Sequence, residues 1–404
     1  MWILILLCLS GAAQNGVAHT QWVVVISIVF SCGISDERTT SIISLDLPVG
    51  CIILIEIVRS IINYEGANGP CGIATIATAI VFYFLCRLVM CRAIHISALL
   101  AAISIPAALI TWSAIAQFDT HYTDMFAIGL TDPVSMRHRL LMAPSHWVLG
   151  EWLTALLLTL FCATAPVLHA WLGGKKKLAI ALAIPVWVIS IALSLSLSRG
   201  IVSSMAVFAA LTFSLLCAYR VVPWKRAVTG ACCAVLYLGG LAVLENVRYP
   251  GVLRAYSGSE VSQVRSTEGR LAIWKRSTDV FLQHPLTGVG SGNAPLYLAS
   301  SADQEETTGF ASRTFSLPVQ ILVEKGIIGA VLYLSVLVFA AWEAHRKLRD
   351  PSTSREMKVI TCCLAAGVIA VLFRELTYAS LLEHPATAML FTMLLALIVN
   401  RETG

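Results

Sequence analysis

The sequence STEGRLAIWKRSTDVFL, residues 266–282, lies in the middle of a polar segment that runs from residue 244 to residue 316. Basic and aromatic residues are interleaved in this segment: Arg248, Arg254, Arg265, Arg270, Trp274, Lys275, Arg276, Phe281 and Arg313. Such a segment cannot enter the hydrocarbon of a bilayer, because charged side chains are costly to bury there. It therefore divides a chain that is apolar almost everywhere else into residues 1–243 and residues 317–404.

Composition indicates what the two flanking parts are. Hydrophobic residues make up 57% of the 404 residues, charged residues make up 13%, and the mean hydropathy is +0.80. These values exclude a soluble globular domain. A helical span needs about 20 mostly apolar residues, and apolar runs occur at 2–13, 22–34, 47–62, 72–91, 94–116, 150–172, 178–197, 200–219, 226–244, 317–343, 357–374 and 378–400. We expect an all-α polytopic membrane protein with about twelve transmembrane helices, about nine of them in residues 1–243 and about three in residues 317–404, joined by one large loop that contains short helices.

The basic residues of the short loops predict the orientation of the chain. If the N-terminus is cytoplasmic, every strongly basic short loop falls on the cytoplasmic side, where Lys and Arg are normally enriched. These residues are Arg38, Arg87, Arg92, Lys175, Lys176, Lys177, Arg220, Lys225, Arg226, Arg346, Lys347, Arg349, Arg355, Lys358 and Arg401. The polar segment 244–316 then lies on the opposite side, which in a bacterium is the periplasmic face of the inner membrane. Arginines on that face indicate an anionic partner. Because the other basic residues are scattered over short loops, no nucleic acid partner is expected.

The twelve cysteines do not predict a metal site. All but Cys71 lie in or beside apolar runs, where cysteine behaves as a small buried hydrophobe. The adjacent pairs at 232–233 and 362–363 lack the spacing of metal ligands. An Asp-x-His-x-x-Asp group at 119–124, in the external loop 117–150, is interpreted as part of a solvated loop. We expect neither a metal nor another cofactor.

Arg199 is the first candidate for chemistry. It follows Ser198 and precedes Gly200 on a hairpin between two predicted spans, with almost no loop to carry it into water. A charge near the hydrocarbon boundary is costly, which makes it a functional candidate by default. The alternative is an arginine that reaches the lipid headgroups by snorkelling. Function is favoured, because the flanking serines and glycine let a polar ligand approach the backbone closely.

Residues 266–282 predict a helix inside the large loop. Ser266 or Thr267 can cap it, and the dipeptide at 284–285, His-Pro, ends it. Arg270, Trp274 and Phe281 then fall close to one face, and the helix dipole adds positive potential around Arg270 in the first turn. An anionic diphosphate suits that place. The alternative is an amphipathic helix that lies on the membrane surface and touches lipid phosphates.

Weaker candidates surround these two arginines. The glycine-rich run GVGSG at 288–292 has no strand before it, so it is not a dinucleotide fingerprint, and we interpret Gly288 and Gly290 as a tight turn beneath a substrate. Arg137 and Arg139, in the external loop 117–150, are candidates for phosphate or sugar contacts. For Arg374 and Glu324 packing is the favoured interpretation, whereas Glu375 is expected to face the outer side.

Several of these residues together resemble the O-antigen ligase and polymerase family. They are Ser198-Arg199-Gly200, Gly269-Arg270, Trp274, Phe281, the run PLTGVG at 285–290, and the run QILVEKGIIG at 320–329. The resemblance implies a fold like that of C-type glycosyltransferases, with an undecaprenyl-diphosphate-linked glycan as donor and a glycan or a lipid-linked molecule as acceptor. It also implies transfer with inversion and without a metal, and it matches Arg199 and Arg270 to the family's essential arginines. Arg265, Arg276 and Arg313, together with Trp274, complete the predicted contacts to diphosphate or glycan.

One departure from the family pattern affects the predicted reaction. Ligases carry a His-Asn pair shortly before the Gln-x-x-x-Glu segment, whereas the aligned residues here are Phe315 and Ser316. The usual base is missing, and the carboxylates that could replace it are Glu151, Glu324 and Glu375. This favours a polymerase that extends a surface polysaccharide among membrane lipids, with a chain-length regulator as a candidate partner. The alternatives are a ligase that transfers the glycan to lipid A core and, in third place, an anion transporter.

Overall fold

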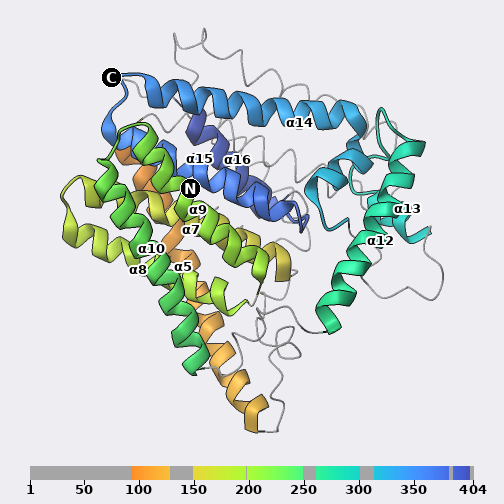
Figure 1. Cartoon of the computed structure of the whole chain (residues 1–404), viewed down its shortest axis with the longest axis horizontal. Coiled ribbons are helices and arrows are strands. Elements are labelled where there is room, and N and C mark those ends of the chain that lie inside the picture. The colour runs from red at the N-terminus through yellow and green to blue at the C-terminus, as the bar shows by residue number, and fades with distance from the viewer. Residues whose placement is uncertain are drawn as a thin grey trace, which may run out of the picture.

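The computed structural model of this chain describes residues 92–127, 149–196, 198–248, 261–300, 314–381 and 385–400. These residues form the helices α5 (Ala93–Ala127), α7 (Leu149–Leu172), α8 (Lys176–Leu195), α9 (Arg199–Ala218), α10 (Trp224–Arg248), α12 (Val261–Gln283), α13 (Ala294–Ser300), α14 (Leu317–Arg349), α15 (Arg355–Glu375) and α16 (Pro385–Val399). Within the described residues there is no strand, so the all-α prediction is confirmed for this part of the chain. Figure 1 shows the long apolar helices packed side by side and α12 and α13 placed to one side of them.

Six helices of the described part are long and apolar enough to cross a membrane: α5 over 93–120, α7 over 150–172, and the whole of α8, α9, α14 and α15. Each of them overlaps one of the apolar runs expected from the sequence, and α8 and α9 end one or two residues before their runs do. α16 is a shorter apolar helix, Thr387–Val399. The predicted spans at 2–13, 22–34, 47–62 and 72–91 lie outside the described residues, so the total of about twelve stays a prediction.

Three predicted boundaries are wrong. α12 begins at Val261 instead of residue 266, so Ser266 and Thr267 lie inside the helix and do not cap it, and Arg270 is not in the first turn. α5 continues to Ala127, beyond the expected start of the external loop at 117, and Asp119 in its last part binds Arg248 of α10 at 2.6 Å. α16 begins at Pro385 instead of residue 378. The residues before it form a turn whose amides bind the Glu375 carboxylate, and an amide that binds a carboxylate cannot take part in a helical hydrogen bond.

α7 is the central helix of the apolar bundle, where it packs against α5, α8 and α15. Leu157, Leu158 and Phe161 on this helix have no exposed surface. The ring of Phe161 stacks on Phe208 of α9 at a centroid distance of 4.2 Å. Phe161 also lies against α15, where a β-carbon added at Gly367 would be 3.0 Å from Phe161 Cβ. The close approach of α15 to α7 therefore depends on a residue without a side chain.

The turns after α9 and α14 lie together at one end of the bundle. Tyr219 Oη and His345 Nδ1 are 2.7 Å apart, and Arg355 Nε donates to the Val221 carbonyl at 3.1 Å. Lys347 reaches the last turn of α16 and donates to the Ile398 carbonyl at 2.7 Å, where the helix dipole favours a cation. The basic residues that were expected on one side of the membrane in these loops do gather at one end of the described bundle.

α14 is broken near its start. Gly326 has φ 63° and ψ −167°, which no helical residue adopts, so the amides of Ile327 and Ile328 cannot bond to the carbonyls of Val323 and Glu324. The turn after α12 fills the break. Val289 and Gly290 donate their amides to the Val323 and Glu324 carbonyls, both at 2.9 Å, and Ile327 and Ile328 donate to the Pro285 and Leu286 carbonyls at 2.9 and 3.3 Å. All four backbone groups that the break releases are thus satisfied by one turn.

A second, smaller core covers this break. Its buried members are Ile273, Val280, Val289, Ala294, Leu298, Phe315 and Val323, and they come from α12, the glycine-rich turn, α13 and the start of α14. Trp274 Nε1 donates to the Thr314 carbonyl at 2.8 Å, which fastens α12 to the segment that precedes α14. Figure 1 shows α12 and α13 beside the start of α14. The polar part of the chain is therefore fixed to the bundle through α14.

Candidate active site

Arg199 begins α9, at the end of the bundle opposite to the basic turns. The preceding residue, Ser198, has extended backbone with φ −90° and ψ 108°, and its side chain does not cap the helix. A β-carbon at Gly200 would lie 3.6 Å from Thr377 Oγ1, so the first turn of α9 lies against the turn between α15 and α16. A helix N-terminus that begins with an arginine carries two sources of positive potential at one point.

Arg270 of α12 approaches the same region from the small core. Its guanidinium carbon lies 5.7 Å from the centre of the Phe315 ring, in the geometry of a cation–π contact. Burial lowers the pKa of Arg270 below its usual value, the nearby Tyr378 opposes this shift, and repulsion from Arg199 adds to it. Phe315 meets Tyr378 edge to face at 6.0 Å, and Tyr378 follows Thr377, which lies against Gly200, so both arginines lie beside the turn between α15 and α16. An anion placed between them would relieve both the repulsion and the loss of hydration.

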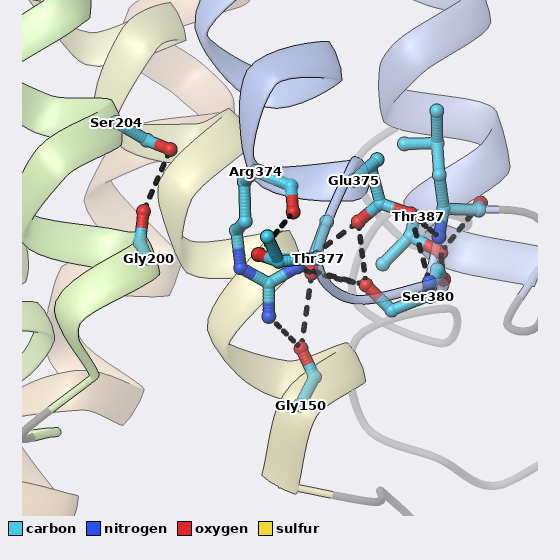
Figure 2. A network of polar contacts seen from close by, with 10 residues as sticks. Gly150, Gly200, Ser204, Arg374, Glu375, Thr377, Ser380 and Thr387 are labelled. Atoms are coloured by element: carbon cyan, nitrogen blue, oxygen red, sulfur yellow. Dashed lines mark hydrogen bonds and ion pairs between the residues drawn. The ribbon is translucent and has the colours of Figure 1, made fainter. Parts of the chain in front are cut away.

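A buried polar network lies beside the first turn of α9, where Gly200 approaches Thr377 (Figure 2). Arg374, at the end of α15, is only 3% exposed. Its Nη2 donates to the Gly150 carbonyl at 2.9 Å, and its Nη1 donates to Ser380 Oγ at 2.9 Å, to Glu375 Oε1 at 3.0 Å and to the Thr154 hydroxyl. Two of these contacts go to α7, one to the end of α15 and one to the following turn, so Arg374 holds the three parts together.

Glu375 supplies the negative charge of this network, opposite the Arg374 guanidinium. Its side chain is fully buried, and its two oxygens accept the amides of Ser380 and Leu381 at 2.8 and 2.9 Å and the Ser380 hydroxyl at 2.8 Å. A buried carboxylate needs such a set of donors and a paired cation to remain charged. The arrangement explains why two adjacent charges can end an otherwise apolar helix.

Comparison with known proteins adds to this geometry. Residues 184–334 match a family model described as O-antigen ligase. This segment is similar to the O-antigen ligase family. A search of curated proteins finds no match. The resemblance inferred from the motifs is thereby confirmed, and it supports a glycosyl-transferring enzyme of the ligase or polymerase type that acts in a membrane on a glycan or a lipid-linked substrate.

The O-antigen ligase segment runs from within α8 into α14, so it includes Arg199, Arg270 and the break at Gly326. Trp274 serves the small core through its bond to Thr314, and Arg276 lies half-buried on α12. Arg265 belongs to the first turns of α12, and its predicted contact with substrate stays a prediction. The predicted contacts Arg137, Arg139 and Arg313 lie outside the described residues.

Gly288, Gly290 and Glu324 meet at the break in α14. Gly288 has φ 67°, and a β-carbon on it would overlap the backbone of Glu324 and Lys325. The Glu324 side chain is buried and accepts from Gln320 Nε2 at 3.5 Å, and the neighbouring Lys325 donates to the Ser291 hydroxyl. These glycines therefore have a structural task at the break. Their predicted contact with substrate stays a prediction.

The sequence analysis missed three residues of the site, namely Gly150, Thr154 and Tyr378. The phenol end of Tyr378 lies directly on Gly150, where an added β-carbon would overlap it. The only signal in the sequence was the Arg-Glu pair at 374–375, because two charges at the end of an apolar run need partners. Which partners they find depends on helix packing. Among the described residues, no group of three or more His, Cys, Asp and Glu side chains could hold a metal ion.

Proposed function

We propose that this protein is an inner-membrane glycosyltransferase that polymerises lipid-linked oligosaccharides at the periplasmic face, with an undecaprenyl-diphosphate-linked glycan as donor. The observation that carries the proposal is that two cations lie beside one turn: Arg270 lies 5.7 Å from the Phe315 ring, which meets Tyr378, and the neighbouring Thr377 lies against Gly200, next to Arg199. Burial lowers the pKa of the half-buried Arg270, and the charge of Arg199 adds to this shift. Such a pair is unfavourable when empty and favourable around a diphosphate.

The proposed reaction needs stabilisation of a leaving group. The acceptor hydroxyl attacks the anomeric carbon from the face opposite to the diphosphate, the carbon–oxygen bond to the diphosphate breaks, and negative charge collects on the departing phosphate oxygen. Guanidinium groups and a helix N-terminus fixed beside the leaving group would stabilise that charge without reorganisation. Arg199, Arg270 and the first turn of α9 supply these groups.

The acceptor proton must also leave. Phe315 occupies the position where the sequence comparison expects a histidine, and its ring lies under the Arg270 guanidinium. Of the carboxylates considered as a base, Glu375 is committed to Arg374, Ser380 and Leu381. Glu151, in the first turn of α7, and Glu324 are both 6% exposed, so burial does not distinguish them. We therefore propose Glu324 as the first carboxylate to test, because it lies at the break that joins the Arg270 unit to α14.

The experiment compares lipid-linked products of the full chain in lipid bilayers. Wild type, Arg199→Ala, Arg270→Ala and the control Lys275→Ala receive an undecaprenyl-diphosphate oligosaccharide, and the products are separated on a gel. We expect a ladder of polymers that falls by about 10²–10³-fold in both arginine variants, as for the loss of one donor to a developing anion. Lys275 is exposed on the same helix, and its loss should change the rate by less than about twofold.

Other results point to the alternative functions. Product that forms only after lipid A core is added would make the protein a ligase. Anion transport that persists in Arg270→Ala, together with no sugar transfer to either acceptor, would refute the proposal that the protein is a glycosyltransferase.

A further inference from the structure

Four side chains from four segments form one continuous row at the external end of the bundle. Arg374 lies 5.0 Å from the centre of the Tyr378 ring, the Tyr378 and Phe315 rings meet edge to face at 6.0 Å, and Phe315 lies 5.7 Å from Arg270. The row begins at the buried network and ends at the arginine that we assign to the diphosphate. Arg374 and Tyr378 both lie after the O-antigen ligase segment, which ends at residue 334.

The first member of the row is fixed. The donors of Arg374 are directed at Gly150, Thr154, Glu375 and Ser380, and the residue is only 3% exposed. Because these partners belong to α7, the end of α15 and the following turn, Arg374 cannot shift without breaking bonds to all three. It gives the row a rigid origin.

The two rings in the middle are fixed as well. Tyr378 lies between the Arg374 guanidinium on one side and Gly150 on another, where there is no room for a β-carbon. Phe315 is 7% exposed and holds a backbone φ of 51°, a left-handed conformation that is unfavourable for a residue with a side chain. Such a conformation persists only where the surroundings determine it. Here the preceding residue, Thr314, is held by Trp274, and the ring fills the space between Tyr378 and Arg270.

The last member, Arg270, is the one that needs positioning. An arginine side chain has many rotamers, and Arg270 is repelled by Arg199 when no anion is present. The face of an aromatic ring restricts where the guanidinium can lie. The position of the Phe315 ring therefore determines where the Arg270 guanidinium lies before a ligand binds.

We propose that Arg374 is a positioning residue that acts on Arg270 through the rings of Tyr378 and Phe315. The proposal rests on the proposed function in one respect only, namely that Arg270 binds the diphosphate. It assigns a role to the turn between α15 and α16, which lies far from Arg270 in the sequence. Arg374 itself does not touch the reacting atoms in this arrangement.

The test is a double-mutant cycle on binding of undecaprenyl diphosphate, measured with the full chain in lipid nanodiscs. In the wild-type background we expect Tyr378→Leu to weaken binding about fivefold, the effect of losing one ring beside a cation. In the Arg270→Ala background the same change should alter binding by less than about twofold. The conservative Tyr378→Phe keeps the ring and should restore binding to within about twofold of wild type.

Each contrary outcome has a distinct meaning. Equal loss from Tyr378→Leu in both backgrounds would show that the residue only stabilises the bundle, and would overturn the proposal. Equal loss from Tyr378→Phe and Tyr378→Leu would also overturn it, because the hydroxyl and not the ring would then matter. Failure of the proposed function appears separately, as absence of sugar transfer by wild type, because the cycle measures binding and needs no turnover.

Discussion

Replacement of Gly326 by alanine should detach the unit that carries Arg270. The residue has φ 63° and ψ −167°, a region that is essentially restricted to glycine and that costs other residues about 1–3 kcal/mol. A β-carbon there would also overlap backbone atoms of Leu286 and Gly288, which cannot move aside as a side-chain end could. The break in α14 is therefore more costly to keep with alanine at this position.

The chain has an alternative that alanine favours. If α14 straightens through residue 326, the amides of Ile327 and Ile328 bond to the carbonyls of Val323 and Glu324, as in any helix. Four bonds to the turn 285–290 are exchanged for two helical ones, a loss of about 2 kcal/mol at about 1 kcal/mol per bond. Alanine in a helix regains about 1 kcal/mol relative to glycine. For Gly326→Ala, straightening α14 therefore costs less free energy than keeping the broken conformation with its backbone strain and steric overlap. The turn 285–290 should then separate from α14.

Hydrogen exchange followed by mass spectrometry in nanodiscs distinguishes the two states. We expect the amides of Val289 and Gly290 to lose their protection in Gly326→Ala, while those of Ile327 and Ile328 keep theirs, and sugar transfer to be abolished. Gly269→Ala is the matched control, because a β-carbon at this position of α12 meets nothing within 4 Å. Protected amides at 289 and 290 together with normal transfer in Gly326→Ala would refute this account of the break.

Three further changes test other parts of the structure. Lys347→Met should lower the free energy of unfolding by about 1–2 kcal/mol in thermal or denaturant melts and leave transfer unchanged, because it removes the donor to the Leu397 and Ile398 carbonyls at the basic end; a loss of transfer with unchanged stability would contradict this. Gly150→Ala should reduce both thermal stability and undecaprenyl diphosphate binding, since the added β-carbon displaces Tyr378; a variant with normal binding would show that the position of the phenol does not matter. Transfer should persist in excess EDTA, because arginines supply the counter-charge; inactivation that added Mg²⁺ reverses would contradict the proposed mechanism.

Much of the fold could be predicted because the apolar runs can be located directly in the sequence. The apolar runs at 150–172 and 178–197 appear as α7 and α8 with ends within two residues, because a bilayer requires an uninterrupted helix of a certain length. The end of the helix around Arg270 was predicted from the His-Pro dipeptide that follows it, and α12 does end at Gln283. Its start was not predicted, because α12 begins at Val261 and the expected capping residues Ser266 and Thr267 lie inside it. The family was recognised from local motifs in the same way.

The contacts of the candidate site could not be predicted in this manner. Nothing in the sequence singles out Tyr378 and Phe315. Their ring and cation–π contacts form between segments that are distant in the sequence and come together only when the helices pack. The glycine-rich run at 288–292 predicted a tight turn but not its partner. The break in α14 that receives it is visible only in the backbone angles of Gly326.

The sequence by itself determined that the described chain is a set of apolar helices with an arginine-rich polar segment, because burial of charge in hydrocarbon is so unfavourable that composition decides it. Only the tertiary structure decided that Arg199 and Arg270 lie beside the same turn and that Arg374 and Glu375 are shielded from solvent by their partners. The physical reason is the range of the forces involved. Hydrophobic transfer acts on each segment separately, whereas hydrogen bonds and ring contacts act over a few ångströms and exist only after the helices have packed.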